Sequence, residues 1–141
     1  MTSVRSPGLL ETPSVSVRKS PVHGLGVFAL KPLPGRRKIG EVGGRIVDAR
    51  RALREIARSR RIYFVQLDER HGLDCSRGNA LGRLNHSCRP NCYLRIVRHR
   101  VEVYSLRPIR RGEELVIDYG QTPHRKGMKC LCGSKDCKDI I

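Results

Sequence analysis

Hydrophobic and polar residues alternate in short runs along most of the chain, with the period of strands rather than helices. Extended segments of this kind recur at residues 15–17, 27–30, 39–47, 62–67 and 115–119. Two further alternating runs between residues 93 and 106 flank Arg98, His99 and Arg100, which predicts a hairpin with a basic tip. The pattern therefore predicts a mostly β fold.

One segment has the period of a helix. Asp48 is a suitable N-cap, and apolar residues recur behind it at three- and four-residue spacing as far as Arg61, at Ala49, Ala52, Leu53, Ile56 and Ala57. The opposite face is almost entirely arginine, and it is either a solvated face or the basic wall of a groove for an acidic partner.

The length, the apolar runs and the charge of the chain exclude several classes of protein. The 141 residues suit a single domain, and residues 1–14 have the composition of a flexible leader. No apolar run approaches the roughly 20 residues of a membrane helix, and no signal peptide is recognisable, so we expect an intracellular protein that is neither secreted nor membrane-bound. The formal charge of +16 favours non-specific association with nucleic acid. We expect a monomer by default.

The six cysteines suggest a metal site. Three of them crowd together near the C-terminus as Cys130, Cys132 and Cys137, in a segment rich in lysine and glycine. In an intracellular protein such clustering favours metal binding over disulfides. A tetrahedral Zn²⁺ site wants four ligands, so the fourth must come from elsewhere in the chain, with the candidates Cys75, Cys88, Cys92 or a histidine.

Three other motifs carry chemistry. The turn H-G-L-G-V-F contains Gly24 and Gly26, which allow close approach to bare backbone. The segment N-H-S-C-R-P-N-C at 85–92 packs an amide, an imidazole and two thiols into eight residues, and G-E-E-L-V-I-D-Y at 112–119 runs from a turn through a strand to an aspartate and a tyrosine. Each is weak evidence alone.

Together and in this order, these motifs and the C-x-C-G-x3-C tail resemble the SET-domain protein lysine methyltransferases over about residues 15–141. The resemblance implies a mostly β fold, a β-clip of small sheets with one short helix. It also implies a knot-like core in which the N-H-S-C and D-Y segments thread together. The implied division is a leader at 1–14, a SET domain at 15–121 and a zinc-bound post-SET module at 122–141.

The resemblance also implies site residues. S-adenosylmethionine would be held by the backbone of Gly24, Leu25 and Gly26, with contacts from Tyr63 in a strand, from Asn85 and His86, and from Leu131 over the adenine. Tyr119 would be the catalytic tyrosine, Ile117 the position that governs how many methyl groups are added, and Asp118 a structural partner. The structural zinc would be bound by Cys88, Cys130, Cys132 and Cys137.

The sequence is compatible with two functions. The first is an S-adenosylmethionine-dependent N-methyltransferase for a lysine of a protein substrate, such as a histone or another nucleic-acid-associated protein, acting in the cytoplasm or on nucleoid or chromatin. The second is a catalytically silent, basic, zinc-stapled module that binds nucleic acid or an acidic protein. The remaining histidines are interpreted as solvated, and Cys75 and Cys92 as small buried hydrophobic residues.

Overall fold

The computed structural model describes residues 13–22, 24–58, 62–120, 129–135 and 137–141. Within these ranges it has ten strands, one α-helix and one short 3₁₀ helix, which confirms the mostly β prediction. The first twelve residues of the expected leader, and residues 122–128 of the expected tail module, lie outside the described residues.

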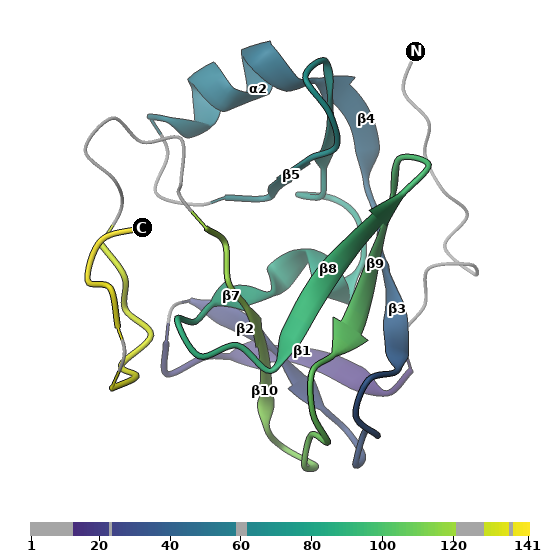
Figure 1. The fold of residues 1–141 in the computed structure, drawn as a ribbon, viewed down its shortest axis with the longest axis vertical. Coiled ribbons are helices and arrows are strands. Elements are labelled where there is room, and N and C mark those ends of the chain that lie inside the picture. Colours follow the sequence, from purple (N-terminus) through teal and green to yellow (C-terminus); the bar gives the residue numbers. More distant parts are fainter. Residues whose placement is uncertain (1–12, 23, 59–61, 121–128, 136) are drawn as a thin grey trace.

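The described strands form three small sheets (Figure 1). The first has the order β1 (Val15–Lys19), β2 (Leu25–Ala29), β10 (Glu114–Ile117) and β7 (Asn85–His86). The second has the order β3 (Lys38–Val42), β9 (Arg100–Ser105) and β8 (Cys92–Val97). The third has the order β4 (Arg45–Asp48), β6 (His71–Asp74) and β5 (Phe64–Gln66).

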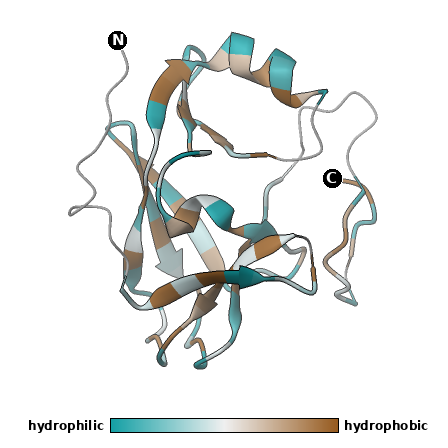
Figure 2. Ribbon diagram, turned by 180° about the vertical axis from the view of Figure 1, so that it is seen from behind, coloured by the Kyte–Doolittle hydropathy of each residue, from teal (hydrophilic) through white to brown (hydrophobic). Residues whose placement is uncertain are grey.

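A single hydrophobic core joins these sheets. Its fully buried members include Val27, Val101, Val103 and Leu115 from strands of the first two sheets and Leu81 from η1 (Ala80–Arg83). Along the strands, hydrophobic and hydrophilic residues alternate in short bands (Figure 2). Each small sheet thus contributes one face to the shared core, as the period-two pattern requires.

The pairing of β7 with β10 is parallel, whereas the other strand pairs described are antiparallel. It aligns Val116 with Asn85 and Ile117 with His86. Asn91 strengthens this junction, because its side chain accepts from the Val116 N–H at 2.9 Å and donates to the Glu114 carbonyl at 2.8 Å. The two polar motifs singled out in the sequence therefore meet in the core.

The helix is shorter than the apolar pattern predicts. Asp48 does cap α2 (Ala49–Ile56), accepting the Arg51 N–H at 3.1 Å, but the helix ends at Ile56 rather than at Arg61. The Arg58 N–H bonds to the Glu55 carbonyl three residues back, so the last turn tightens and the helix stops. Residues 59–61 lie outside the described part of the chain. No helix among the described residues is long and apolar enough to cross a membrane.

Most extended segments are confirmed, with two differences. The stretch 39–47 divides at Gly43 and Gly44 into β3 and β4, which belong to different sheets. The prediction that Tyr63 lies in a strand is wrong, because β5 begins at Phe64. The hairpin is confirmed, and Arg98 and His99 form its tip with φ of 50° and 61°, a left-handed turn that matches the twist of the strands.

Candidate functional site

A cavity of about 710 Å³ lies beside the start of β2, β7 and the C-terminal tail. We call it the large cavity. Six of the seven residues that the resemblance assigns to a cofactor line it, namely Gly24, Leu25, Tyr63, Asn85, His86 and Leu131. They come from segments more than a hundred residues apart in the sequence, so only folding brings them together.

The seventh, Gly26, is not among the residues that line the cavity. A Cβ at this position would be 2.3 Å from Glu114 Oε2, so the glycine is needed for the close approach of the Glu114 side chain. Gly24 has a different role, because its φ of 47° is a conformation that glycine adopts without strain. The Gly24 carbonyl accepts the Ser20 N–H at 2.8 Å, which closes the turn that precedes β2.

Glu114 organises this wall, although the sequence pattern alone did not single it out. Its carboxylate accepts the Ser20 hydroxyl at 2.8 and 2.9 Å and the Asn85 amide at 2.9 Å. The same Asn85 amide donates to the Leu25 carbonyl at 3.0 Å. Asn85 is therefore fixed between the glycine turn and β10, with its orientation set by two acceptors.

A cation stacks on the ring of Tyr63. The Arg83 guanidinium lies 4.3 Å from the centre of the Tyr63 ring and donates to the Ser76 carbonyl at 2.7 Å. The Cys75 N–H bonds to the Tyr63 carbonyl at 2.9 Å. Stacking of this kind fixes the ring at the cavity wall without a strand.

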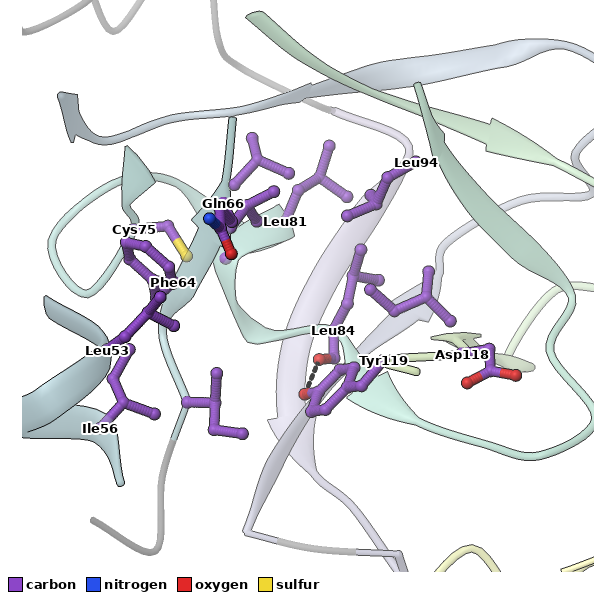
Figure 3. A pocket seen from close by; sticks show the side chains of 15 residues that line it. Leu53, Ile56, Phe64, Gln66, Cys75, Leu81, Leu84, Leu94, Asp118 and Tyr119 are labelled. Carbon is purple, nitrogen blue, oxygen red and sulfur yellow. Dashed lines mark hydrogen bonds between the residues drawn. The ribbon is translucent and has the colours of Figure 1, made fainter. Parts of the chain in front are cut away.

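A second cavity, of about 340 Å³, adjoins the first and is shown in Figure 3. We call it the small cavity. Leu53 and Ile56 of α2, Phe64 and Gln66 of β5, and Leu94 of β8 point into it. The residues that line both cavities are Ile62, Gly82, Leu84 and Tyr119. Tyr119 thus lies where the two cavities meet.

Tyr119 is anchored at three points. Its hydroxyl donates to the Leu84 carbonyl at 2.5 Å, as the dashed line in Figure 3 marks, and its ring packs edge-on against His86 with centroids 5.4 Å apart. Its backbone N–H donates to His86 Nδ1 at 2.9 Å. Burial raises the pKa of the Tyr119 phenol above its usual value, so the hydroxyl stays protonated. The Leu84 carbonyl had no signal in the sequence.

His86 connects this tyrosine to the cysteines. Because Nδ1 accepts the Tyr119 N–H, the ring is neutral with its proton on Nε2, which lies 3.3 Å from Cys88 Sγ. Burial lowers the pKa of His86, against the opposing effect of the Asp118 carboxylate 3.7 Å away, and so favours this neutral form. The imidazole therefore donates toward the Cys88 sulfur.

Ile117 and Asp118 follow one another at the end of β10 and both line the small cavity, but Ile117 is buried and Asp118 is exposed. Ile117 is buried and lines the small cavity, with no polar atom on its side chain. Asp118 points away from the Tyr119 ring in Figure 3 and accepts the Gly120 N–H at 2.8 Å. Its carboxylate also lies 3.7 Å from Lys138 Nζ of the tail. These contacts are structural.

Four cysteine sulfurs converge where the tail meets the core, with all Sγ atoms within 4.8 Å of one another, on Cys88, Cys130, Cys132 and Cys137. The Cys88 and Cys130 sulfurs are 3.8 Å apart. Thiolates bound tetrahedrally at about 2.3 Å from Zn²⁺ are separated by about 3.8 Å, so the spacing fits this ion. Of the candidates left open by the cysteine pattern, Cys88 completes the cluster.

Polar groups around these sulfurs suit thiolate ligands. The Lys138 N–H points at Cys88 Sγ at 3.3 Å, the Asp139 N–H at Cys137 Sγ at 3.4 Å, and the Ser134 hydroxyl lies 3.3 Å from Cys132 Sγ. Donors of this kind stabilise sulfur ligands and fix their direction. The cluster also positions Leu131, half of whose surface is exposed, at the edge of the large cavity.

The other two cysteines are separate from this cluster. Cys75 and Cys92 are buried in the hydrophobic core, and burial raises the pKa of each thiol to about 12. They behave as small apolar residues, as the sequence suggested.

Comparison with known proteins agrees with this geometry. The sequence model of the SET domain matches residues 24–120. The chain is 33% identical over 137 residues to the histone-lysine N-methyltransferase set-2 of Caenorhabditis elegans, covering 90% of this chain and 9% of that protein. It is 30% identical over 142 residues to a Kluyveromyces lactis histone-lysine N-methyltransferase, H3 lysine-4 specific, covering 90% and 14%.

A third relative is the histone-lysine N-methyltransferase trithorax of Drosophila virilis, 32% identical over 136 residues, with 90% of this chain and 4% of that protein covered. The chain thus spans a small fraction of the length of these relatives. The matched segment contains the glycine turn, the parallel pair of β7 with β10 and Tyr119. On this match over more than half of its length, the chain belongs to the SET domain family.

Proposed function

We propose that this chain is a protein-lysine N-methyltransferase that uses S-adenosylmethionine as its methyl donor. The observation that carries the proposal is the position of Tyr119, which lines both the large and the small cavity and whose hydroxyl is held by the Leu84 carbonyl. Two substrates entering from separate cavities would come together at this one side chain. The names of the relatives support the same reaction class.

The large cavity fits the donor in size and chemistry. Its volume of about 710 Å³ lies within the range of small-molecule sites, about 300–1,000 Å³. Lys19 and Lys129 line it and can pair with the carboxylate of the donor, and Tyr63 offers a ring face. Asn85 would bind the methionyl part and His86 the adenine part. When bound, S-adenosylmethionine supplies a methyl group already activated by a sulfonium.

The small cavity suits the side chain of a lysine. Its wall is largely apolar and includes Leu84, Leu94 and Ile117. Only a neutral amine can accept a methyl group, and a lysine ammonium ordinarily has a pKa of about 10.4. Removal from water into this apolar passage lowers that pKa and favours the neutral amine. The wall also excludes water from the reacting atoms.

Tyr119 acts in this proposal as an orienting group rather than a base. Its pKa is raised by burial, so at neutral pH it holds its proton and offers a hydroxyl dipole. The Leu84 carbonyl and the His86 ring fix where that hydroxyl lies. A hydroxyl fixed in this way aligns the amine with the methyl group, and alignment supplies much of the rate in such a transfer.

The zinc cluster fastens the tail over the donor. Zn²⁺ bound by Cys88 of the core and the three cysteines of the tail would keep Leu131 and Cys130 against the large cavity. Loss of the metal would therefore open the donor site as well as release the tail.

The substrate is a lysine in a protein segment, with histones favoured by the names of the relatives. An intracellular setting, on chromatin or nucleoid or in the cytoplasm, is part of this proposal, and the charge of +16 would retain the chain near nucleic acid. We expect the enzyme to act as a monomer.

The test is transfer of labelled methyl groups from S-adenosylmethionine to histones and to a whole-cell protein extract. Zinc-loaded wild type should label protein, and Tyr119→Phe should reduce the rate by at least about 100-fold, the scale for loss of one preorganised donor. Binding of the donor, measured by calorimetry, should change less than about threefold. The matched control is Tyr104→Phe, since Tyr104 lies outside both cavities and stacks on Tyr93.

Equal rates for wild type and Tyr119→Phe would overturn the assignment of Tyr119. Absence of both transfer and donor binding, together with steeply salt-dependent DNA binding, would replace the enzyme with the basic zinc-stapled binding module.

The number of methyl groups added is a separate proposal. Ile117 has no hydroxyl to hold the amine, so the amine can turn after the first transfer and accept further methyl groups. Mass spectrometry of exhaustively treated substrate should show di- or trimethyl-lysine, and Ile117→Tyr should shift the product toward monomethyl-lysine. Monomethyl-lysine alone from the wild type would contradict this reading.

A further inference from the structure

Three ligand-type side chains meet on the surface, in a cluster that shares no residue with the four cysteines. Asp68 lies in the turn between β5 and β6, His71 is the first residue of β6, and His99 belongs to the tip of the β8–β9 hairpin. We call this group the surface triad. From the sequence we interpreted both histidines as solvated. His99 is distant from Asp68 and His71 in the chain, so the cluster could not be recognised before the fold was known.

The triad is arranged around one oxygen. Asp68 Oδ2 lies 2.9 Å from His71 Nδ1 and 2.9 Å from His99 Nε2. The two imidazole rings have centroids 4.8 Å apart and an interplanar angle of 40°. Two nitrogens from different segments therefore point toward a common carboxylate oxygen.

The carboxylate of Asp68 is held by the backbone of its own turn. Asp68 Oδ1 accepts the N–H groups of Arg70 at 2.8 Å and His71 at 2.6 Å. An aspartate carboxyl is an anion at neutral pH. The anion is fixed in place before any ligand arrives, in the way that supporting hydrogen bonds fix metal-binding carboxylates.

We propose that the surface triad is a second transition-metal site, which binds Zn²⁺, Ni²⁺ or Cu²⁺ independently of the cysteines. All three ligand atoms already lie within 4.8 Å of one another. Donors at about 2.0–2.1 Å in a tetrahedral site are about 3.3 Å apart, so the two 2.9 Å pairs must widen by about 0.4 Å, and the two nitrogens, no more than 4.8 Å apart, must come to the same spacing. The side chains are 43 to 46% exposed, which leaves room for this shift and for water ligands.

The donor set selects the class of ion. Two imidazoles with one carboxylate suit Zn²⁺, Cu²⁺ and Ni²⁺, whose bonds to nitrogen are strong. Ca²⁺ and Mg²⁺ need more oxygen ligands than the one carboxylate offers. Two arginines are close to the triad in the chain, since Arg70 follows Asp68 by two residues and Arg98 directly precedes His99. Their positive charges further disfavour Ca²⁺ and Mg²⁺, which are bound mainly by electrostatic attraction.

Binding would connect two parts of the fold. The β5–β6 turn extends from β5, and the hairpin tip extends from β8, and both strands contribute to the wall of the small cavity through Phe64, Gln66 and Leu94. An ion bound by Asp68, His71 and His99 would join the second sheet to the third at the end of these strands. We expect it to stabilise the folded chain in proportion to its affinity.

The test uses untagged full-length protein with zinc in the cysteine cluster, freed of weakly bound metal by a short chelator treatment and desalting. Ni²⁺ is then added in a calorimeter, and thermal unfolding is followed with and without it. Wild type should bind one equivalent and unfold at a higher temperature when it is present. Asp68→Asn and His99→Ala should each weaken binding at least tenfold and lose the shift.

The matched control is His124→Ala, which removes a histidine outside the triad and should leave both readouts unchanged. Circular dichroism of each variant without Ni²⁺ establishes that it is folded, which the exposure of the three side chains favours. The proposal is overturned if wild type binds no Ni²⁺ below about 1 mM, or if Asp68→Asn and His99→Ala bind it as tightly as wild type does.

Discussion

Gly26→Ala tests the packing of the donor-side wall. The added Cβ would lie 2.3 Å from Glu114 Oε2, 2.9 Å from its Cδ and 3.0 Å from Ser20 Cβ, so the carboxylate of Glu114 must move. That carboxylate accepts hydrogen bonds from Ser20 at 2.8 and 2.9 Å and from Asn85 at 2.9 Å. Hydrogen bonds to charged groups contribute about 1.5–3 kcal/mol each, and the displaced groups are only partly buried. We therefore expect a loss of about 2–4 kcal/mol in the free energy of unfolding.

Two further variants isolate the cause. Gly24→Ala meets no atom within 4 Å but keeps a φ of 47°, so it should cost only the backbone strain of about 1–2 kcal/mol. In a Glu114→Ala background only the 3.0 Å contact with Ser20 Cβ remains, so Gly26→Ala should there cost about 1 kcal/mol. The difference between the two backgrounds is the coupling energy of a double-mutant cycle.

The assay is urea unfolding of zinc-loaded protein, followed by circular dichroism, with calorimetry of S-adenosylmethionine binding on the same samples. Gly26→Ala should weaken donor binding at least tenfold, since Asn85 loses one of its two acceptors. The reasoning would be refuted if Gly26→Ala lowered the free energy of unfolding equally with and without Glu114. It would also be refuted if Gly26→Ala lowered it less than Gly24→Ala does.

Three other predictions concern the core, the loss of stability at low pH and the metal. Asn91→Ala should lower the free energy of unfolding by about 2–4 kcal/mol in urea titration, because Asn91 is buried and its loss leaves the Val116 N–H without its side-chain acceptor; a cost below about 0.5 kcal/mol would contradict this. Hydrogen bonding to Arg100 lowers the pKa of the nearly buried Glu41 to about 2, so its stabilisation is complete above about pH 4.5 and is lost as pH falls toward 2. Glu41→Gln should therefore cost about 1–3 kcal/mol at pH 7 and little at pH 2, and a pH-independent cost would argue against the pair. Adding Co²⁺ to the metal-free protein should give sulfur-to-metal absorption that Cys88→Ser weakens and shifts, whereas an unchanged spectrum would remove Cys88 from the proposed ligand set.

The sequence by itself determined the class of fold and most of the ingredients of the site. Alternating apolar residues specified short strands, because side chains of a strand point to opposite faces with period two. The hairpin at Arg98 and His99 and the cap at Asp48 followed from local turn and helix chemistry. These features depend on neighbours a few residues apart, so they can be recognised without knowing the rest of the molecule.

Polar segments gave weaker signals. The strand β6 was not predicted, because His71–Asp74 contains one large apolar residue and no alternation. The end of α2 at Ile56 was missed for a related reason, since the apolar spacing continues to Ala57 while a tightened last turn ends the helix. Secondary-structure propensity and the hydrophobic period predict a strand poorly where its pairing partner decides the structure.

Only the tertiary structure decided which residues meet. Glu114 lies 29 residues after Asn85 and 94 after Ser20, yet its carboxylate bonds to both. The Leu84 carbonyl that orients Tyr119 is a backbone atom with no side-chain signature. Hydrogen bonds of this kind form only at about 3 Å. The sequence does not show which remote segments come that close, because this depends on how the core packs. The same is true of the surface triad, which the third sheet and the hairpin assemble from residues 31 positions apart.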